Sequence, residues 1–564
     1  MASKYVQMAE NYAKNVLEGN ILVCKWTELA CARFFDDLEL ARKGWKYRLN
    51  EEKAHKACTL FELLPHAKGK WETPLLKMEP WQAFILVNVF GWEDESGYRR
   101  FKTSYIEVPR KNAKTTLAAV VGHIGLTLDE EIGAEIYSSA TNREQARICF
   151  DIAKTMAEKS PDFRKRFGIE NMAHAIVRLS EGSSFRPLSS DATSLDGLNV
   201  HISIIDELHA HKTRDVWDVI ETATGSRKQP LVFAITTAGS NRAGICYEQR
   251  IYLTKILERI FRDEASEQYF GIIYTIDEND DWTDEKVWAK ANPNWNVSVS
   301  PDDIRRKAKK AMQMTSAQNN FLTKHLNVWV NADTAWMDMR SWEKCGDPAL
   351  SRADFENEQA IIGLDLATKR DVAARVDVFR RKIDDDYHYY VFGKYYLPEE
   401  AVENADNSQY SGWAIDGRLT VTDGNVTDFN QICDELIENR KNILQVAYDD
   451  HQAVMLVSEL HSHGIPLIMV PMQVKVLSDP MKELEALVHT QRLHHDCCPV
   501  LTWMMSNVIA HLDAKENIYP RKERAENKID GVVALIMSLA AWFKVDQIET
   551  VGPSVYEERG FLML

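Results

Sequence analysis

The sequence has 564 residues, of which 45% are hydrophobic and 27% charged, and its formal net charge is −16. This balance is typical of globular domains and excludes a mainly disordered chain. The acidic balance argues against a surface that is basic overall, but it is compatible with local basic patches and with carboxylate clusters that bind metal ions.

The cysteines and the N-terminus indicate the compartment. The 9 Cys residues are scattered without repeated C-x-x-C pairs, which fits a reducing compartment. The N-terminal segment does not read as a signal peptide, and no apolar stretch has the length of a membrane span. We therefore expect a cytoplasmic protein that has no membrane partner.

Residues 1–70 are predicted to form a helical segment, because apolar residues recur there at helical spacing. Residues 71–335 are predicted to form one domain. Its first part alternates short β-rich and helical runs, which is typical of a parallel α/β sheet, and about 244–335 reads as a helical lid or linker part. The expected strands are 104–108, 134–139, 177–179, 200–205 and 231–237, with helices at 114–128, 143–159 and 215–223.

A second domain, residues 356–546, is predicted after a polar linker at 336–355, and residues 547–564 are expected to form a C-terminal tail. The domain opens with apolar runs that read as strands, and it closes with a helix. The expected strands are 360–366, 372–380, 387–396, 445–448 and 466–470, and the closing helix is 531–542.

The segment 108–115, Val-Pro-Arg-Lys-Asn-Ala-Lys-Thr, lies between an expected strand and a helix of small residues. This layout is typical of a phosphate-binding loop, in which backbone N–H groups and the helix N-terminus face the phosphates. Lys114 would reach the β- and γ-phosphates, and the Thr115 hydroxyl would contact Mg²⁺. Because Val108 and Ala113 stand where the usual pattern has glycine, the loop taken alone fits an exposed basic turn better than a phosphate-binding loop.

Other segments fit a nucleotide site. The apolar strand at 200–205 leads into Asp206-Glu207, which could hold the Mg²⁺ shell and polarise the attacking water. Thr236 and Thr237 end the next strand, where hydroxyls could sense the γ-phosphate. Gln82 offers both a donor and an acceptor to an adenine edge. Taken singly, each has an ordinary structural explanation, such as a capped turn.

In the second domain, Asp365 and Asp449 end strands and Asp530 begins the last helix. Such ends can converge on one site, where paired Mg²⁺ or Mn²⁺ ions would activate water for phosphodiester cleavage. Asp450 is an alternative to Asp449, and Asp371, which precedes the second strand, could help from the periphery. Each Asp could instead cap its element, Asp530 above all.

Together these motifs resemble the large terminase subunits of tailed bacteriophages, which are DNA-packaging motors. The resemblance covers about 75–542 and is closest to the branch whose loop reads Arg-Lys-x-Gly/Ala-Lys-Ser/Thr. It implies an α/β protein with an N-terminal RecA-like (additional-strand) P-loop ATPase domain and a C-terminal RNase H-like nuclease domain.

The resemblance also implies roles for individual residues. Glu207 is the catalytic base, Thr236 and Thr237 form the coupling motif, and Asp365, Asp449 and Asp530 are nuclease metal ligands. The ATP site comprises Gln82, Arg110, Lys111, Asn112, Ala113, Lys114, Thr115, Thr116 and Asp206.

Relatives carry an Arg-Gly pair before the Asp-Glu strand, interpreted as an arginine finger. This sequence has Asp196-Gly197 there. Arg143 and Arg214 are therefore the candidates for the finger, although each also fits an ordinary helix-start or surface arginine.

The family implies an enzyme that hydrolyses ATP with Mg²⁺ to move double-stranded viral DNA into a procapsid, and that cuts concatemeric DNA with a divalent-metal-dependent endonuclease. The implied partners are DNA, the portal protein of the procapsid, the small terminase subunit and copies of this chain in a ring of five. The protein would act in the bacterial host cytoplasm, docked on the portal, and would be absent from the mature virion.

Two alternatives belong to other classes. The spelling Asp206-Glu207-Leu208-His209 fits a DExH-type helicase or restriction-like DNA-dependent ATPase, but the sequence has no recognisable second RecA-like domain. A non-catalytic DNA-binding capsid-assembly protein with a decayed ATPase is supported by the two non-glycine positions in the loop, Val108 and Ala113.

Overall fold

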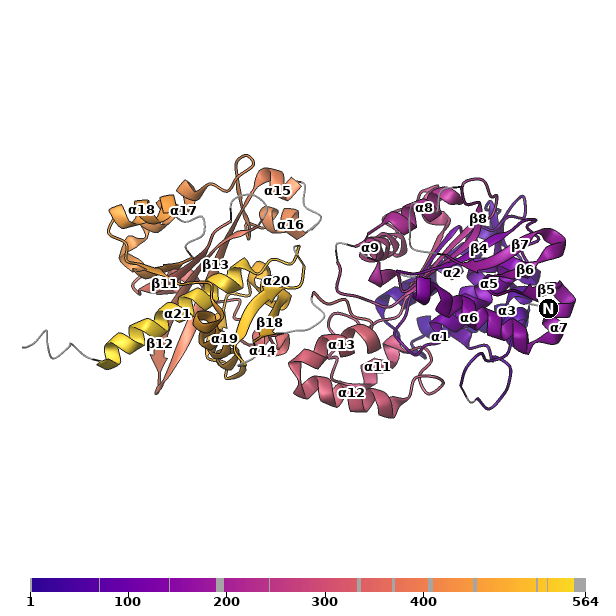
Figure 1. The fold of residues 1–564 in the computed structure, drawn as a ribbon, viewed down its shortest axis with the longest axis horizontal. Coiled ribbons are helices and arrows are strands. Elements are labelled where there is room, and N and C mark those ends of the chain that lie inside the picture. Colours follow the sequence, from indigo (N-terminus) through magenta and orange to yellow (C-terminus); the bar gives the residue numbers. More distant parts are fainter. Residues whose placement is uncertain are drawn as a thin grey trace, which may run out of the picture. The chain divides into compact units, whose positions relative to one another are not determined.

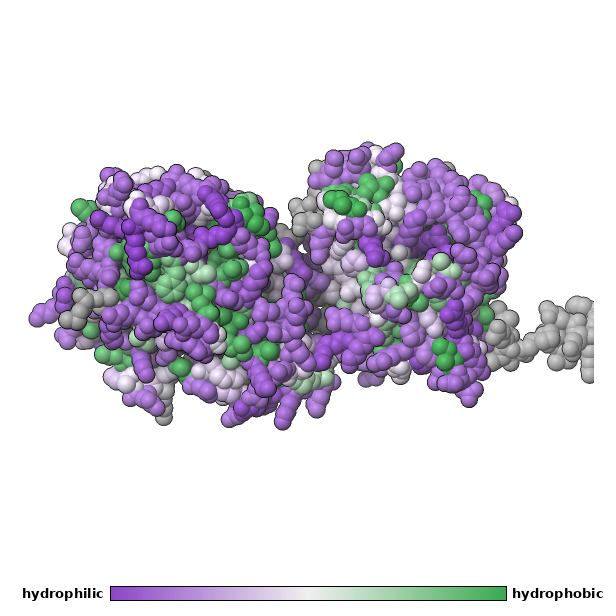
Figure 2. All heavy atoms as spheres, turned by 180° about the vertical axis from the view of Figure 1, so that it is seen from behind, coloured by the Kyte–Doolittle hydropathy of each residue, from purple (hydrophilic) through white to green (hydrophobic). Residues whose placement is uncertain are grey.

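The computed structural model describes residues 3–69, 71–141, 143–188, 197–211, 213–242, 244–331, 336–367, 371–403, 409–449, 454–513, 516–524 and 526–551. The chain forms two compact units, Met1–Met314 with Gln318–Asp333, and Thr315–Ala317 with Thr334–Leu564. Each unit has its own sheet (Figure 1). Figure 2 shows a mostly hydrophilic face on which hydrophobic residues form separate patches. None of the helices in the described ranges is long and apolar enough to cross a membrane.

The first unit is built on a sheet in the order β10-β3-β9-β8-β4-β7-β6-β5. The strands from β10 to β7 run parallel, and β6 and β5 extend the sheet in antiparallel fashion. Because β9 lies between β3 and β8, the predicted additional-strand arrangement is confirmed. The strands are β3 (Thr103–Glu107), β4 (Glu135–Ser139), β5 (Ile169–Asn171), β6 (Ile176–Arg178), β7 (Ser183–Pro187), β8 (Val200–Asp206), β9 (Leu231–Thr236) and β10 (Tyr269–Ile273).

Helices cover this sheet. They include α4 (Pro80–Gly91), α5 (Lys114–Thr127), α6 (Arg143–Lys159), α8 (Asp215–Ala223) and α9 (Ile245–Leu257), with the shorter α7 (Pro161–Phe167) and α10 (Glu264–Glu267). Helix α5 lies so close to the sheet that a Cβ on Gly122 would be 2.4 Å from the Phe185 ring. The small residues that follow the loop therefore set how closely this helix approaches the strands.

The N-terminal helices belong to the same core. They are α1 (Lys4–Leu17), α2 (Lys25–Arg42) and α3 (Glu51–Leu63), and the short strands β1 (Tyr47–Leu49) and β2 (Trp92–Asp94) pair beside them. Arg33 of α2 donates to the carbonyls of Ser266 and Tyr269, and Arg100 lies 2.8 Å from Asp37. Buried residues of α1, α2 and α3 therefore pack in the same hydrophobic core as the sheet.

The region predicted to be helical after residue 244 also contains β10, a run of five buried residues at the sheet edge. Its apolar run has no alternation that would distinguish a buried strand from a buried helix. The helices α11 (Glu285–Ala291), α12 (Pro301–Gln313) and α13 (Thr315–His325) follow and pack around a small core of their own.

The second unit has a sheet in the order β14-β13-β12-β11-β15-β16, with β17 also paired to β13. The strands β13, β12 and β11 are antiparallel, whereas β11, β15 and β16 are parallel, as expected for an RNase H-like sheet. The strands are β11 (Ala360–Asp365), β12 (Ala373–Ile383), β13 (Asp386–Pro398), β14 (Thr420–Thr422), β15 (Ile443–Tyr448), β16 (Leu467–Met469) and β17 (Leu493–His495), with a separate hairpin of β18 (Val508–Leu512) and β19 (Ile518–Lys522).

Helices lie on both faces of this sheet. Neighbouring residues of β11 point to opposite faces, and each contacts a different set of helices. Ile361 packs with α19 (Val474–His489), α20 (Pro499–Asn507) and α21 (Asp530–Val551), and Ile362 packs with α17 (Phe429–Glu438) and α18 (Val454–Ser462). The helices α15 (Glu399–Glu403) and α16 (Gln409–Ile415) lie between β13 and β14 in the chain.

Two predicted boundaries differ from the observed elements. The expected linker at 336–355 contains α14 (Met339–Lys344), whose Trp342 is fully buried in the core of the second unit. Helix α21 continues to Val551, and the rest of the expected tail lies outside the described residues. Linker polarity is a poor guide here because four residues of the segment, Trp336, Met337, Trp342 and Cys345, are buried in the core of the second unit.

Candidate functional site

The loop between β3 and α5, which is predicted to bind phosphate, holds two residues other than glycine at positive φ. Lys111 and Ala113 both have positive φ angles, 74° and 56°, and Ala113 is the residue that precedes α5. Residues other than glycine rarely adopt a positive φ, so two of them in one short loop indicate that the surrounding contacts constrain its backbone. Arg110 and Lys111 are exposed, and Thr116 lies in the first turn of α5.

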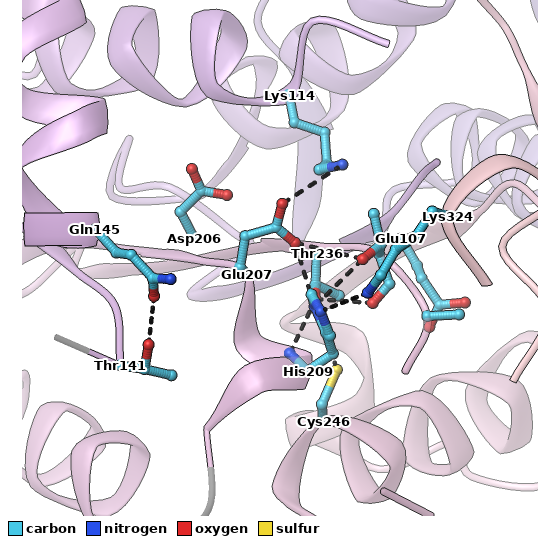
Figure 3. Close-up of polar contacts among 12 residues, drawn as sticks. Glu107, Lys114, Thr141, Gln145, Asp206, Glu207, His209, Thr236, Cys246 and Lys324 are labelled. Carbon is cyan, nitrogen blue, oxygen red and sulfur yellow. Dashed lines mark hydrogen bonds and ion pairs between the residues drawn. The ribbon is translucent and has the colours of Figure 1, made fainter. Parts of the chain in front are cut away.

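Lys114 is buried beneath this loop. Its Nζ donates to the carbonyls of Val108 and Pro109 at 3.2 and 3.3 Å and lies 4.0 Å from Oε1 of Glu207. Burial lowers the pKa of Lys114, and the charge of Glu207 opposes that effect. Figure 3 shows Lys114 and Glu207 facing one another beside Asp206.

Asp206 ends β8 opposite the start of α5. Thr115 Oγ1 donates to its Oδ2 at 3.2 Å, while Oδ1 is buried and has no hydrogen-bond partner among the described residues. Burial and the charge of Glu207 raise the pKa of Asp206 to about 6. A buried carboxylate oxygen without a donor, next to a threonine hydroxyl, fits a divalent cation, because such cations prefer oxygen ligands.

Glu207 has a positive φ of 54° and a partly exposed carboxylate. Its Oε2 lies 3.2 Å from His209 Nδ1, and Thr237 Oγ1 donates to it at 3.4 Å. Burial raises the pKa of Glu207, but the hydrogen bond from His209 and the charge of Lys114 outweigh burial and lower it to about 2. The two neighbouring acids are therefore shifted in opposite directions, and Glu207 keeps its charge at neutral pH.

Thr236 and Thr237 lie at the end of β9, between the loop strand and the Asp206 strand, and both are buried. Thr236 Oγ1 accepts a hydrogen bond from the His209 N–H at 3.0 Å. The structure thus brings together the predicted loop, the acid pair Asp206 and Glu207, and the two threonines predicted to couple hydrolysis to movement.

Asn112 fixes the loop to the segment after α11. Its side chain donates to Asn292 Oδ1 at 2.9 Å and accepts from the Asn294 N–H at 3.0 Å. Asn294 in turn accepts from the Trp81 indole at 2.6 Å. Gln82 is buried beside that tryptophan, and its Oε1 accepts the Glu79 N–H at 3.2 Å in a capping box that starts α4.

Sequence reasoning missed His209, Lys324 and Asn292 as parts of this site. His209 could have been found from the Asp-Glu-Leu-His spelling. Asn292 and Lys324 lie in the helical segment, far from the loop in sequence, and carry no local signal.

The arginine-finger candidates are placed differently. Arg214 is half exposed and pairs with Asp218 and Glu248, which fits an ordinary surface arginine as well. Arg143 begins α6, but its side chain is outside the described residues, as is Asp196.

Asp365, Asp449 and Asp530 are on neighbouring elements of the second unit. Asp365 ends β11, and Asp449 follows Tyr448, which pairs with Leu364 in the adjacent strand. Asp530 starts α21, which packs on β11 so closely that a Cβ on Gly363 would lie 1.9 Å from the Ala534 carbonyl oxygen. Asp450 is outside the described residues.

The charges of these acids affect one another. Burial, and then the charges of Asp530, Asp449 and Asp371, raise the pKa of Asp365 well above its usual range. Burial and the charge of Asp371 raise the pKa of Asp530 to about 6. Repulsion of this kind is relieved when a cation binds.

The three acids provide only part of the geometry that a metal ion needs. In the part of the chain that the structure describes, Asp530 Oδ2 is buried without a hydrogen-bond partner, which fits a cation ligand. Asp371, however, pairs with Lys522 and Lys528. Within the same residues, no group of three or more His, Cys, Asp or Glu side chains is arranged to hold a metal ion. The acids have the right chemistry, but they do not form a closed coordination shell here.

Comparisons with known proteins cover both units. Residues 80–255 match the model of the terminase large subunit ATPase domain, and residues 263–546 match that of the terminase large subunit endonuclease domain. The chain is 35% identical over 401 residues to Protein YmfN of Escherichia coli (strain K12), covering 69% of this chain and 87% of that protein.

Two further similarities involve Enterobacteria phage HK97. Its "Terminase, large subunit" is 26% identical over 493 residues, covering 84% of this chain and 92% of the phage protein. The crystal structure of the HK97 large terminase has a TM-score of 0.43 and 24% identity, covering 87% of this chain and 99% of that one.

The matched domains carry an ATPase and an endonuclease, which implies the use of a nucleotide and a divalent metal. They favour DNA packaging over a helicase and over a non-catalytic assembly protein. The chain therefore belongs to the terminase large subunit family and is an ATPase and endonuclease of DNA packaging.

Proposed function

We propose that the loop before α5 binds ATP with Mg²⁺ and that Glu207 is the base of ATP hydrolysis. The observation that carries this proposal is the meeting of Lys114, Asp206 and Glu207 at the ends of adjacent elements. Lys114 and the exposed Arg110 would neutralise phosphate oxygens, together with the N–H groups of residues 111–116. Thr115 and Asp206 would hold Mg²⁺, which neutralises phosphate charge when bound.

Glu207 is suited to the role of base. Its low pKa keeps the carboxylate ionised at neutral pH, so an oxygen is available to orient and polarise the attacking water. Thr237 contacts Glu207 directly, and Thr236 contacts it through His209. A change of Glu207 when the γ-phosphate leaves would therefore alter the contacts at the end of β9. The capping box uses Oε1 of Gln82, so the NH₂ group of the same amide would donate to the adenine edge.

In the second unit, Asp365, Asp449 and Asp530 would hold one or two Mg²⁺ or Mn²⁺ ions, with Asp450 as the alternative to Asp449. Bound ions would activate a water and polarise the scissile phosphate. The buried, partnerless oxygen of Asp530 and the raised pKa of Asp365 support this assignment. Asp371 is held by lysines and would act only at the periphery.

We also propose that the ATPase domain covers 71–335, with a lid or linker part at 244–335, and that the nuclease domain covers 356–546. The chain would act on double-stranded DNA as a ring of five on the portal, with a small terminase subunit, in the bacterial host cytoplasm. It would contact DNA mainly through phosphates, so binding would weaken as salt rises. Arg143 or Arg214 would supply the arginine finger.

Paired variants test the two sites in the full-length chain. Glu207→Gln should abolish ATP hydrolysis and leave metal-dependent plasmid cleavage intact, whereas Asp365→Ala should do the reverse. Glu221→Gln on the exposed side of α8 and Asp385→Ala in the turn between β12 and β13 are matched controls. ATP hydrolysis at the parent rate by the Glu207 variant, or plasmid cleavage by the Asp365 variant, would refute the corresponding assignment.

A further inference from the structure

His209 is the residue at which three parts of the ATPase unit meet. Its Nδ1 lies 3.2 Å from Glu207 Oε2 and 3.1 Å from Thr236 Oγ1, and its Nε2 lies 3.2 Å from Lys324 Nζ. Glu207 follows β8, Thr236 ends β9, and Lys324 is in the last turn of α13. Figure 3 shows the imidazole between these groups.

The partners of the ring determine where its proton lies. A lysine ammonium group can only donate, so Nε2 of His209 must accept from Lys324 and the proton must be on Nδ1. The Thr236 hydroxyl donates to the Thr237 carbonyl at 2.9 Å, so its oxygen is an acceptor for Nδ1–H as well. Burial lowers the pKa of His209, which keeps the ring neutral, as this arrangement requires.

The chain of contacts therefore has a direction. The ammonium of Lys324 donates to the imidazole, and the imidazole donates to the Glu207 carboxylate or to the Thr236 oxygen. The same turn of α13 contacts the phosphate-binding loop, because the Arg110 N–H donates to the Lys324 carbonyl at 3.0 Å. A shift of the loop and a shift of α13 thus both change the position of the donor that holds Glu207.

We propose that His209 is a positioning residue of the ATPase: it orients the Glu207 carboxylate and makes that orientation depend on Lys324 of α13. The proposal rests on the proposed role of Glu207 as base. In this arrangement Glu207 points correctly only while α13 is docked on the loop. The helical segment therefore affects catalysis through Lys324 and His209.

A packing role alone would predict something else. His209 is also in a tight place, since a Cβ on Gly239 would lie 3.2 Å from the His209 Cβ. If the imidazole only filled space, the Gln variant, whose side chain is closer to histidine in volume, would retain more activity than the Asn variant. Nucleotide affinity would also fall together with the turnover rate.

Two variants separate the halves of the contact. The amide of His209→Asn can replace the Nδ1–H donor but cannot reach Lys324, and the amide of His209→Gln can replace the Nε2 acceptor but not the donor. The assays are ATPase kcat with DNA present, the affinity for a fluorescent ADP analogue, and plasmid cleavage as a check on folding. All are made on the full-length chain. Lys309→Met, an exposed lysine of α12, is the control for Lys324→Met.

We expect kcat to fall about 100-fold in His209→Ala and His209→Gln, because a misplaced base costs about that much. In His209→Asn and Lys324→Met we expect a fall of about 10-fold, as for one charge-assisted hydrogen bond. Combining these two changes should add nothing further, since both remove the same contact. ADP affinity and plasmid cleavage should stay within about twofold of the parent.

A kcat in the Gln variant equal to or higher than that in the Asn variant, additive losses in the double variant, or a parallel loss of ADP affinity would each overturn the proposal. Glu207→Gln distinguishes this failure from failure of the proposed function. If that variant is inactive while the His209 series behaves as a packing site, only the positioning role is wrong. If that variant hydrolyses ATP normally, the role of Glu207 itself is wrong.

Discussion

Replacing Gly363 with alanine should disable the nuclease unit while sparing the ATPase. The added Cβ would lie 1.9 Å from the Ala534 carbonyl oxygen, whereas ordinary contacts begin at 3.4 Å, so α21 must move away from β11 by about 1.5 Å. The obstacle is backbone and cannot rotate away. Overpacking costs about 1–3 kcal/mol and occasionally more, so we expect a loss of about 3 kcal/mol from the second unit.

The same movement would displace Asp530, the first residue of α21, from Asp365, the last residue of β11. Because a displacement of about 1 Å can cost about 100-fold, plasmid cleavage should fall by at least that factor. The assays are metal-dependent plasmid cleavage, ATP hydrolysis and thermal unfolding by circular dichroism. Gly412→Ala is the control, since a Cβ there meets nothing within 4 Å. Parental cleavage and unfolding temperature in Gly363→Ala would refute the close approach of α21 to β11.

Other predictions concern the first unit. Burial lowers the pKa of His123 from 6.5 to about 4. The buried neutral ring therefore stabilises the fold in full above pH 6.5. The free energy of unfolding should fall by about 3 kcal/mol as the pH drops from 6.5 toward 4, because the ring must then be protonated. His123→Gln, which keeps a donor for the Ala153 carbonyl, should remove this dependence in urea titrations at pH 7 and 4.5. Arg250→Met leaves the fully buried Glu107 without its cationic partner at 2.6 Å, so the free energy of unfolding in urea should fall by about 3–5 kcal/mol. Arg250→Lys keeps a positive charge and should lose less. Equal losses in the two variants would contradict the charge argument. Asn112→Ala frees the phosphate-binding loop and should weaken binding of a fluorescent ADP analogue about tenfold, and unchanged binding would show that the loop holds its shape alone.

The sequence was most informative where an element is uniformly buried or strongly periodic. The observed α6 (Arg143–Lys159) and α8 (Asp215–Ala223) agree with the predicted bounds, and β8 (Val200–Asp206) differs by one residue. Each strand that carries an expected site residue is a short apolar run followed at once by a polar side chain. That local combination predicts a polar group at a strand end without any knowledge of the tertiary contacts.

What could not be predicted depends on contacts between distant segments. Asn112 meets Asn292, and His209 meets Lys324, through helices whose docking on the loop no local pattern reveals. The adenine-reading role expected for Gln82 has a local competitor, because its amide oxygen caps α4. Gln82 stands at the third position of a helix that begins at Pro80, where a capping box has its Glu or Gln, but Glu79 is not one of the usual N-cap residues, so the sequence did not reveal this contact.

Ala113 has a consequence for the thermodynamics of nucleotide binding. A glycine at this position would sample many backbone conformations in the free loop, and most of that freedom would be lost when phosphate binds. An alanine held at a φ of 56° is strained by about 1 kcal/mol, but it has much less conformational entropy left to lose. The replacement that hides the loop from a glycine-based pattern therefore moves an ordering cost from the binding event to the folding of the chain.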